Sequence, residues 1–251
     1  YESGAGPAWA GVSFSVVGRD GLFTAEQLVE TIRPRDQHFP RPRLVAIENT
    51  HNRSGGRVFP QCDVDAIAEA AHARALSVHL DGARIWNASV ATGRPPATLC
   101  EPVDSVCACF SKGLGAPVGS VLAGDTDFIA RAHRYRKMLG GGMRQAGILA
   151  GACLHALDHH VERLADDHDN ARVLAQALSN VDGLGCDPAQ VETNIVVFEV
   201  TSMSGLDFVA LAAEQGVKLA AIDRGRVRAV THLGVSAADI REAAWRLSSL
   251  I

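Results

Sequence analysis

Two short apolar runs that each end in a charged residue constrain this chain more than any other feature. Residues 76–80 are followed at once by Asp81, and residues 105–110 are followed by Ser111 and Lys112. Apolar runs of this length are typical of buried strands. Each run therefore predicts a strand that carries an ionisable side chain to the loop at its carboxyl end.

The pattern around these runs predicts how the strands are arranged. A third apolar run, 44–47, precedes them, and residues 63–75 carry apolar side chains at helical spacing. Strand–helix–strand alternation is typical of a parallel sheet covered by helices. Ligands bind such sheets beyond the carboxyl ends of the strands. We therefore expect Asp81, Lys112 and the ENTHN segment at 48–52 to share one edge of the sheet.

One carboxylate and one lysine at neighbouring strand ends are the two side chains that a pyridoxal phosphate (PLP) site requires. The amine of Lys112 can form a Schiff base with the aldehyde of PLP, and the carboxylate of Asp81 can keep the pyridine nitrogen protonated. A strand-end lysine is more often a surface charge, and a strand-end aspartate often caps the next turn. The pair alone is therefore a weak indication of PLP chemistry.

Five motifs strengthen this hypothesis, and all of them follow one order along the chain. They are ENTHN at 48–52, HLDGARIWNA at 79–88, SKGLGAPVGS at 111–120, RKMLGGGMRQAG at 136–147 and VTHLGV at 230–235. Together they resemble the low-specificity L-threonine aldolases, PLP-dependent enzymes of the aspartate aminotransferase fold (fold type I). The resemblance extends from the first residue to the last. It implies aldol cleavage of L-threonine, L-allo-threonine and other β-hydroxy amino acids to glycine and an aldehyde.

The resemblance also implies a role for each motif residue. It makes Lys112 the catalytic lysine and Asp81 the partner of the pyridine nitrogen. Arg84 and Arg228 match arginines that anchor the cofactor and hold the substrate carboxylate. Paired N–H groups of an arginine fix the orientation of a carboxylate as well as its charge. Two further arginines lie within four residues of Arg228 and leave that choice open.

Four more side chains complete the predicted site. His38 matches a histidine that lies close to the substrate β-hydroxyl, whose proton must be removed, and His51 is the alternative base. Lys137 and Arg144 flank the glycines of RKMLGGGMRQ. The resemblance implies that both help to bind the cofactor phosphate, partly across a subunit interface. The alternatives are a structural or solvated role for His38, a structural role for His51, and a positively charged interdomain turn for Lys137 and Arg144.

The rest of the pattern predicts the domain organisation. Residues 1–150 are expected to form a large PLP-binding domain with a mostly parallel sheet. A long helical pattern predicts a connecting helix over 151–180. Residues 181–251 alternate strands and helices, which predicts a small C-terminal α+β domain that ends in a helix capped by Ser236 and Asp239.

The N-terminal residues give weaker predictions. Residues 12–17 predict a short strand, Thr24 and Gln27 form a capping-box pattern that opens a helix, and residues 33–43 contain three prolines and predict a loop. The resemblance implies a further N-terminal segment, with a Gly-Thr phosphate loop and a ring-stacking histidine, that this sequence does not contain. We therefore expect the chain alone to bind PLP weakly.

Composition excludes several classes of function. The net charge of −4 over 251 residues gives no reason to expect nucleic-acid or membrane partners, and no apolar run approaches the roughly 18 residues of a membrane span. The six cysteines lack zinc-site or disulfide spacing, which is typical of a reducing cytoplasm. His155 and His159 have a metal-binding spacing, but no HExxH motif is present. A solvated helix face is the better interpretation, so no metal is expected.

Two alternatives to the aldolase remain open. The first is a β-eliminating lyase or an aminotransferase of the same fold, and an aminotransferase would release a keto acid instead of an aldehyde. The second is a truncated, non-catalytic chain that only assembles with other subunits. The partners we expect are an amino acid substrate and further copies of the chain, in a dimer of dimers.

Overall fold

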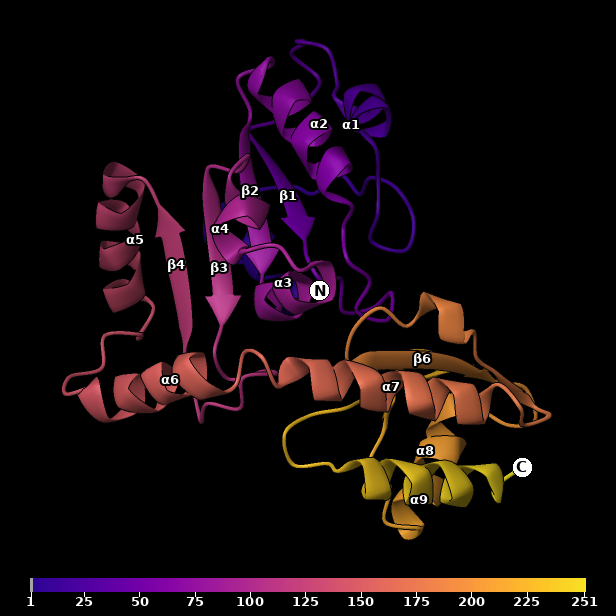
Figure 1. Ribbon diagram of the computed structural model, residues 1–251. Helices are drawn as coiled ribbons and strands as arrows, with labels where there is room; N and C mark the ends of the chain where they lie inside the picture. The colour runs from indigo at the N-terminus through magenta and orange to yellow at the C-terminus, as the bar shows by residue number, and fades with distance from the viewer. Residues whose placement is uncertain (1) are drawn as a thin grey trace.

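A mostly parallel sheet forms the first half of the computed structural model, which describes residues 2–251 (Figure 1). Its strands lie in the order β1-β2-β3-β4, and only the β3–β4 pair is antiparallel. The bounds are β1 (Leu44–Glu48), β2 (Ser77–Gly82), β3 (Ser105–Cys109) and β4 (Ser120–Gly124). The predicted α/β class is confirmed. Because β1, β2 and β3 are parallel, their carboxyl ends meet at one edge.

Helices cover this sheet where the apolar spacing predicts them. Val64, Ile67 and Ala71 of α2 are buried in one core with Ile47 and Leu80 from the strands. The predicted capping box at the start of α1 is confirmed. The helices of this half are α1 (Ala25–Thr31), α2 (Gln61–His72), α3 (Ile85–Thr92), α4 (Pro96–Cys100) and α5 (Thr126–Met138).

A second sheet, entirely antiparallel, follows in the order β5-β6-β8-β7. Its core includes Phe198 and Phe208, whose rings meet edge to face with centroids 5.7 Å apart. The predicted cap of the last helix by Ser236 and Asp239 is confirmed. The elements are β5 (Leu184–Gly185), η3 (Pro188–Gln190), β6 (Ile195–Val200), α8 (Gly205–Glu214), β7 (Ala220–Ala221), β8 (Arg226–Val230) and α9 (Ala237–Ser248).

The strand predicted over 12–17 is wrong. No regular secondary structure is present there, and the preceding residues form short turns, η1 (Glu2–Gly4) and η2 (Gly6–Ala10). The side chains of Phe14 and Val16 are 73% and 90% exposed. A strand needs a neighbour for its backbone hydrogen bonds, and no strand of the described chain pairs with this segment.

The single connecting helix predicted over 151–180 is also wrong. Two helices, α6 (Gly147–His159) and α7 (Leu164–Leu178), are separated by a four-residue break. The break contains neither proline nor glycine, so the sequence carries no local stop signal. His160 turns out of the helix instead, and its ring Nδ1 bonds to the carbonyl oxygen of Leu114 at 2.7 Å. None of the helices in residues 2–251 combines the length and the apolar composition needed to cross a membrane.

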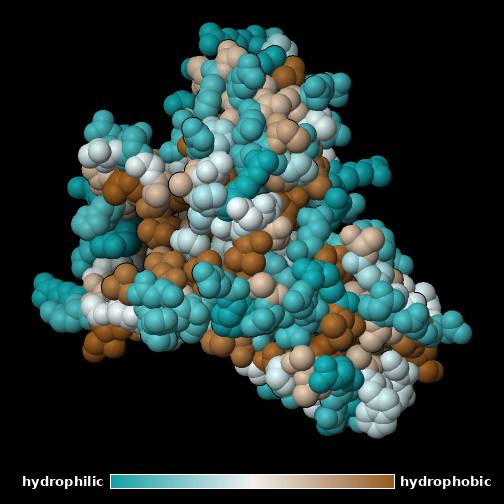
Figure 2. Space-filling view, viewed as in Figure 1, coloured by the Kyte–Doolittle hydropathy of each residue, from teal (hydrophilic) through white to brown (hydrophobic). Residues whose placement is uncertain are grey.

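Hydrophobic side chains are exposed over β4, α5 and α6. All five residues of β4 are exposed, and α5 buries none of its side chains. Figure 2 shows hydrophobic atoms gathered at the surface around β4 and along α6. The large exposed side chains of this region are Val118, Val121, Leu122, Tyr135, Met138, Leu139, Met143, Ile148 and Leu154. We call this region the β4–α6 face.

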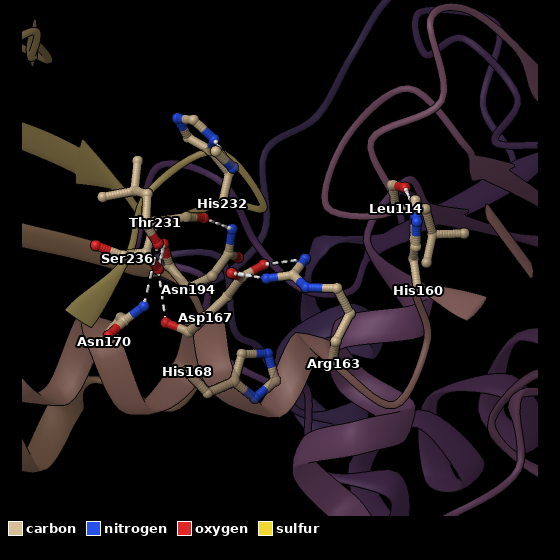
Figure 3. Close-up of polar contacts among 12 residues, drawn as sticks. Leu114, His160, Arg163, Asp167, His168, Asn170, Asn194, Thr231, His232 and Ser236 are labelled. Atoms are coloured by element: carbon tan, nitrogen blue, oxygen red, sulfur yellow. Dashed lines mark hydrogen bonds and ion pairs between the residues drawn. The ribbon is translucent and has the colours of Figure 1, made fainter. Parts of the chain in front are cut away.

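A buried polar network joins α7 to the second sheet (Figure 3), and Asn87 of α3 connects this network to the first half of the chain. Nδ2 of Asn194 donates to the carbonyl oxygen of Thr231 at 2.9 Å, and the hydroxyl of Thr231 donates to the carbonyl oxygen of Asp167 at 2.6 Å. The carboxylate of Asp167 pairs with Arg163. Burial raises the pKa of Asp167, and the guanidinium of Arg163 opposes that shift. Each polar group of the network therefore meets a partner inside the protein.

His168 lies within this network and carries no charge at neutral pH. Its side chain is almost completely buried, and burial lowers its pKa to about 4. An unfolded histidine has a pKa of roughly 6.5. Between these two values the unfolded chain binds a proton that folded His168 does not bind.

We predict that the free energy of unfolding decreases as pH falls from about 6.5 to about 4.5, a range above most carboxyl titrations. The full contribution of His168 is roughly 3 kcal/mol. His168→Asn should flatten this pH dependence in urea unfolding. His133→Asn, at an exposed position, should keep the slope of the parent. Identical slopes for the parent and His168→Asn would contradict the prediction.

Candidate active site

Two arginines from different sheets meet at one amide oxygen. Arg84 follows β2 and donates from Nη2 to Oδ1 of Asn52 at 3.1 Å. Arg228 lies on β8 and donates from Nη1 to the same oxygen at 2.6 Å. The backbone N–H of Asn52 donates to Glu48, the last residue of β1. The structure thus brings both sequence-predicted arginines to the carboxyl ends of the parallel strands.

This pair of guanidinium groups has more hydrogen-bond donors than acceptors around it. Nε of Arg228 is buried and has no hydrogen-bond partner among the described residues. Burial lowers the pKa of Arg84, and the charge of Arg228 lowers it further, whereas Glu48 and Asp81 raise it. Two cations that share one neutral oxygen and leave a donor unpaired suit an anion, and a carboxylate matches the guanidinium fork.

Asp81 lies at the end of β2 with half of its carboxylate uncommitted. Oδ1 accepts the backbone N–H of Ala83 at 3.0 Å and the thiol of Cys107 at 3.5 Å. Within residues 2–251, Oδ2 accepts no hydrogen bond. Burial and the adjacent Asp81 raise the pKa of Cys107 to about 11, so the cysteine remains a thiol and a donor. Oδ2 of Asp81 can therefore accept a hydrogen bond from a protonated nitrogen.

Lys112 lies on a turn that follows β3, the neighbour of β2 in the sheet. Its carbonyl oxygen accepts the backbone N–H of Gly115 at 2.9 Å, which closes the turn. Nε1 of Trp86 donates to the carbonyl oxygen of Cys109 at 3.2 Å, and His160 bonds to Leu114. The turn is therefore held on both sides, while the side chain of Lys112 itself is exposed.

The two candidate bases lie in different surroundings. His51 is next to Asn52; its ring Nδ1 bonds to the hydroxyl of Ser54 at 2.9 Å, and its Nε2 lies 3.4 Å from Oε2 of Glu48. His38 is largely exposed in the loop over 33–43. Its ring bonds to Asp36, and no hydrogen bond within the described chain links it to the arginine pair.

Lys137 and Arg144 lie apart from this cluster. Lys137 is exposed near the end of α5, and Arg144 is exposed in the turn before α6, which begins three residues later. In Figure 1, β3 and β4 separate α5 from β1 and β2. His155 and His159 are both exposed on α6 with ring centroids 4.4 Å apart.

Asn52 is a candidate site residue that the sequence does not single out by itself. The available signal is the position of its motif, ENTHN at 48–52, at the end of a predicted strand. The interaction with both arginines has no sequence signal, because Arg228 lies 176 positions away.

Solved structures with the same architecture define the class of fold. A Leishmania major threonine aldolase superimposes with a TM-score of 0.79 at 17% identity, over 100% of this chain and 73% of that chain. A Listeria monocytogenes protein described as a candidate L-allo-threonine aldolase superimposes with a TM-score of 0.81 at 20% identity, over 100% of this chain and 72% of that chain. Oryza sativa TDC, solved with PLP and tryptamine, superimposes with a TM-score of 0.68 at 18% identity, over 91% of this chain and 52% of that chain. The fold is that of the PLP-dependent enzymes of fold type I.

Sequence comparison is more specific. The family model described as β-eliminating lyase matches residues 1–201. Low-specificity L-threonine aldolase 1 of Arabidopsis thaliana is 39% identical over 247 residues, which cover 96% of this chain and 69% of the relative. The low specificity L-threonine aldolase of Escherichia coli K12 is 41% identical over 238 residues, which cover 90% of this chain and 66% of the relative. The chain belongs to the β-eliminating lyase family, among the low-specificity L-threonine aldolases.

We predict that a small carboxylate binds the arginine pair and stabilises the fold. Acetate at ten times its dissociation constant should raise the free energy of unfolding by about 1.4 kcal/mol. Arg228→Met should abolish this increase, because it removes one guanidinium of the pair. Arg241→Met, at an exposed position on α9, should retain it. Thermal unfolding at matched ionic strength measures the effect, and an equal increase in all three proteins would contradict the prediction.

Proposed function

We propose that the protein cleaves L-threonine, L-allo-threonine and other β-hydroxy amino acids to glycine and an aldehyde. The observation that carries this proposal is the convergence of Arg84 and Arg228 on Asn52, at the strand ends that also bear Asp81 and Lys112. The threonine aldolases among the relatives support the same reaction. Arginine forks hold the amino acid carboxylate, so the Cα–Cβ bond is presented in one orientation.

PLP fits the side chains that are present. The uncommitted Oδ2 of Asp81 can hold a proton on the pyridine nitrogen, and the exposed amine of Lys112 can hold the cofactor covalently. When bound, PLP supplies the electron sink that makes cleavage next to Cα feasible. Arg84 is close to both the cofactor-binding and the substrate-binding residues. It follows Asp81 closely in the sequence, and it shares Oδ1 of Asn52 as an acceptor with Arg228.

Removal of the β-hydroxyl proton requires a base. We retain His38 as the substrate-contacting histidine on the strength of the family resemblance. His51 is the competing base; its proximity to Glu48 and to Asn52 supports it. A histidine has a pKa in the range that general base catalysis near neutral pH requires.

Two other reactions of the same fold are the alternatives. A β-eliminating lyase would use the same lysine and arginines but would expel a substituent from the β-carbon. An aminotransferase would release a keto acid. The aldolase is favoured because the relatives at about 40% identity carry that name over nearly the whole chain. Product analysis distinguishes the three, since only the aldolase releases acetaldehyde from threonine.

We also propose that the protein acts as a homo-oligomer, a dimer of dimers, in the cytoplasm. The accessible surface is 14817 Å² for a mass of 26.5 kDa. A compact monomer of that mass exposes roughly 10,700 Å². The excess of about 4,000 Å² is surface that contacts with other copies of the chain can bury. Six free cysteines are compatible with a reducing compartment.

The β4–α6 face is the surface that we assign to the contact between copies. Lys137 and Arg144 lie within it, flanked by Met138, Met143 and Ile148. In this proposal the two basic side chains bind the cofactor phosphate of the adjacent copy. In the same proposal, Lys137 and Arg144 of one copy lie beside the site of the next copy, to which the large domain (1–150) contributes Lys112 and the small domain (181–251) contributes Arg228.

Lys112→Ala tests the proposed reaction. The parent, incubated with PLP, should develop the visible absorption band of the covalently held cofactor and release acetaldehyde from L-threonine. Lys112→Ala should show neither, because the amine is absent. Lys218→Ala serves as a surface control with parental behaviour. A band that persists in Lys112→Ala would contradict the assignment of the lysine, and keto acid in place of acetaldehyde would contradict the aldolase.

Complementation tests the shared site. Lys112→Ala and Arg144→Ala should each be inactive alone. Co-expressed in equal amounts, they should recover roughly a quarter of the parental activity, because hybrid pairs contain one intact site of two. Sedimentation or light scattering should show an oligomer. Absence of recovery together with a monomeric parent would contradict both the oligomer and the role of Arg144.

A further inference from the structure

We propose that Asn87 is a positioning residue that holds Arg228 in register with the Lys112 turn and with Arg84. The inference rests on the function proposed above, since it assigns the substrate carboxylate to Arg228. Asn87 itself lies outside the cluster of candidate site residues. Its contacts connect three parts of the molecule that each carry one of those residues.

The first contact is with the helix that follows Arg84. The backbone N–H of Asn87 donates to the carbonyl oxygen of Arg84 at 2.9 Å, in the first turn of α3. The side chain of Asn87 is 1% exposed. The buried side chain of Asn87 therefore projects from the helical turn whose backbone is bonded to Arg84.

The second contact is with the second sheet and α7. Nδ2 of Asn87 lies 3.1 Å from Nε2 of His168 and donates to Oδ1 of Asn194 at 3.3 Å. Because burial keeps His168 neutral, its ring nitrogen can accept this hydrogen bond. Both hydrogens of one amide are thus directed at groups outside the parallel sheet, where no water can replace them.

Asn194 links Asn87 to β8, the strand that carries Arg228. It immediately precedes β6, and its Nδ2 donates to the carbonyl oxygen of Thr231 at 2.9 Å. Thr231 follows β8, and Val197 of β6 is the register partner of Arg228 on β8. Figure 3 shows Asn194, Thr231 and Asp167 within this one buried network.

The third contact is with the Lys112 turn. A Cβ atom on Gly113 would lie 3.1 Å from Oδ1 of Asn87 and 2.9 Å from Cδ2 of Leu164. Only a residue without a side chain lets the turn lie this close. The glycine after Lys112 is therefore explained by Leu164 and Asn87 together, and the turn packs directly against Asn87.

A purely structural role is the competing explanation, because loss of buried hydrogen bonds destabilises any protein. The two roles differ in their coupling to Arg228. A residue that acts through Arg228 loses its effect on carboxylate binding once Arg228 is removed. A residue that only stabilises the fold has the same effect with or without Arg228.

A double-mutant cycle on glycine affinity provides the test. Glycine is titrated by calorimetry into the PLP-loaded parent, Asn87→Leu, Arg228→Met and the double variant. Leucine keeps the branching and the number of heavy atoms of asparagine and removes both donated hydrogen bonds. We expect Asn87→Leu to weaken glycine binding about tenfold in the parent background and less than about twofold in the Arg228→Met background.

Thr92→Val is the matched control on the same helix, since its hydroxyl bonds only to Ala88 and Ser89 of α3 and to the backbone N–H of Arg94 just after the helix. It should leave the glycine affinity unchanged. If Asn87→Leu fails to fold, Asn87→Ser, which retains one donor, takes its place. Equal weakening in both backgrounds would overturn the positioning role.

The readout separates this inference from the proposed reaction. A parent that binds glycine but releases no acetaldehyde from threonine contradicts the proposed reaction, and the cycle still decides the role of Asn87. A PLP-loaded parent that binds no glycine overturns the inference directly, because Arg228 then has no carboxylate to hold.

Discussion

Two positive charges directed at one neutral oxygen are the constraint on which the rest of this structure depends. Arg84 and Arg228 come from different sheets, and both donate to Asn52. Like charges at short range in a partly buried setting repel each other, and the charges of Glu48 and Asp81 act against this repulsion. The arrangement is stable only if the surrounding fold holds both arginines in place. An anion bound between them would relieve this repulsion, which supports the carboxylate site that we propose.

The buried polar network supplies that restraint. An apolar contact between the two sheets would tolerate sliding, because hydrophobic attraction has no direction. The hydrogen bonds of Asn87, Asn194 and Thr231 have preferred directions, and loss of any one leaves a buried group unpaired. The neutral His168 belongs to the same design, since a charged imidazole there would require a partner that the network does not contain. These hydrogen bonds therefore favour one relative arrangement of the two sheets over arrangements in which the sheets have slid past each other.

Sequence reasoning succeeded where local patterns decide the structure. The strands before Asp81 and Lys112 and the caps at Thr24 and Ser236 depend on residues close in sequence. It failed where distant contacts decide. The strand predicted over 12–17 lacks a neighbour, and the predicted helix over 151–180 breaks because His160 bonds to Leu114, 46 positions earlier. The apolar stripe continues through that break, so its periodicity contains no sign of it.

The sequence by itself determined at which strand ends Asp81 and Lys112 lie, because parallel strands with helical crossovers expose their carboxyl ends on one side. It also predicted which residues carry the chemistry. Motif resemblance added their roles. Only the tertiary structure decided which of these residues meet. It joined Arg228 to Arg84 through Asn52, left Lys137 and Arg144 on the exposed β4–α6 face, and made Asn87 a link between three segments. Contacts of this kind depend on the relative placement of whole sheets, which is fixed by buried groups far apart in sequence and by no local pattern.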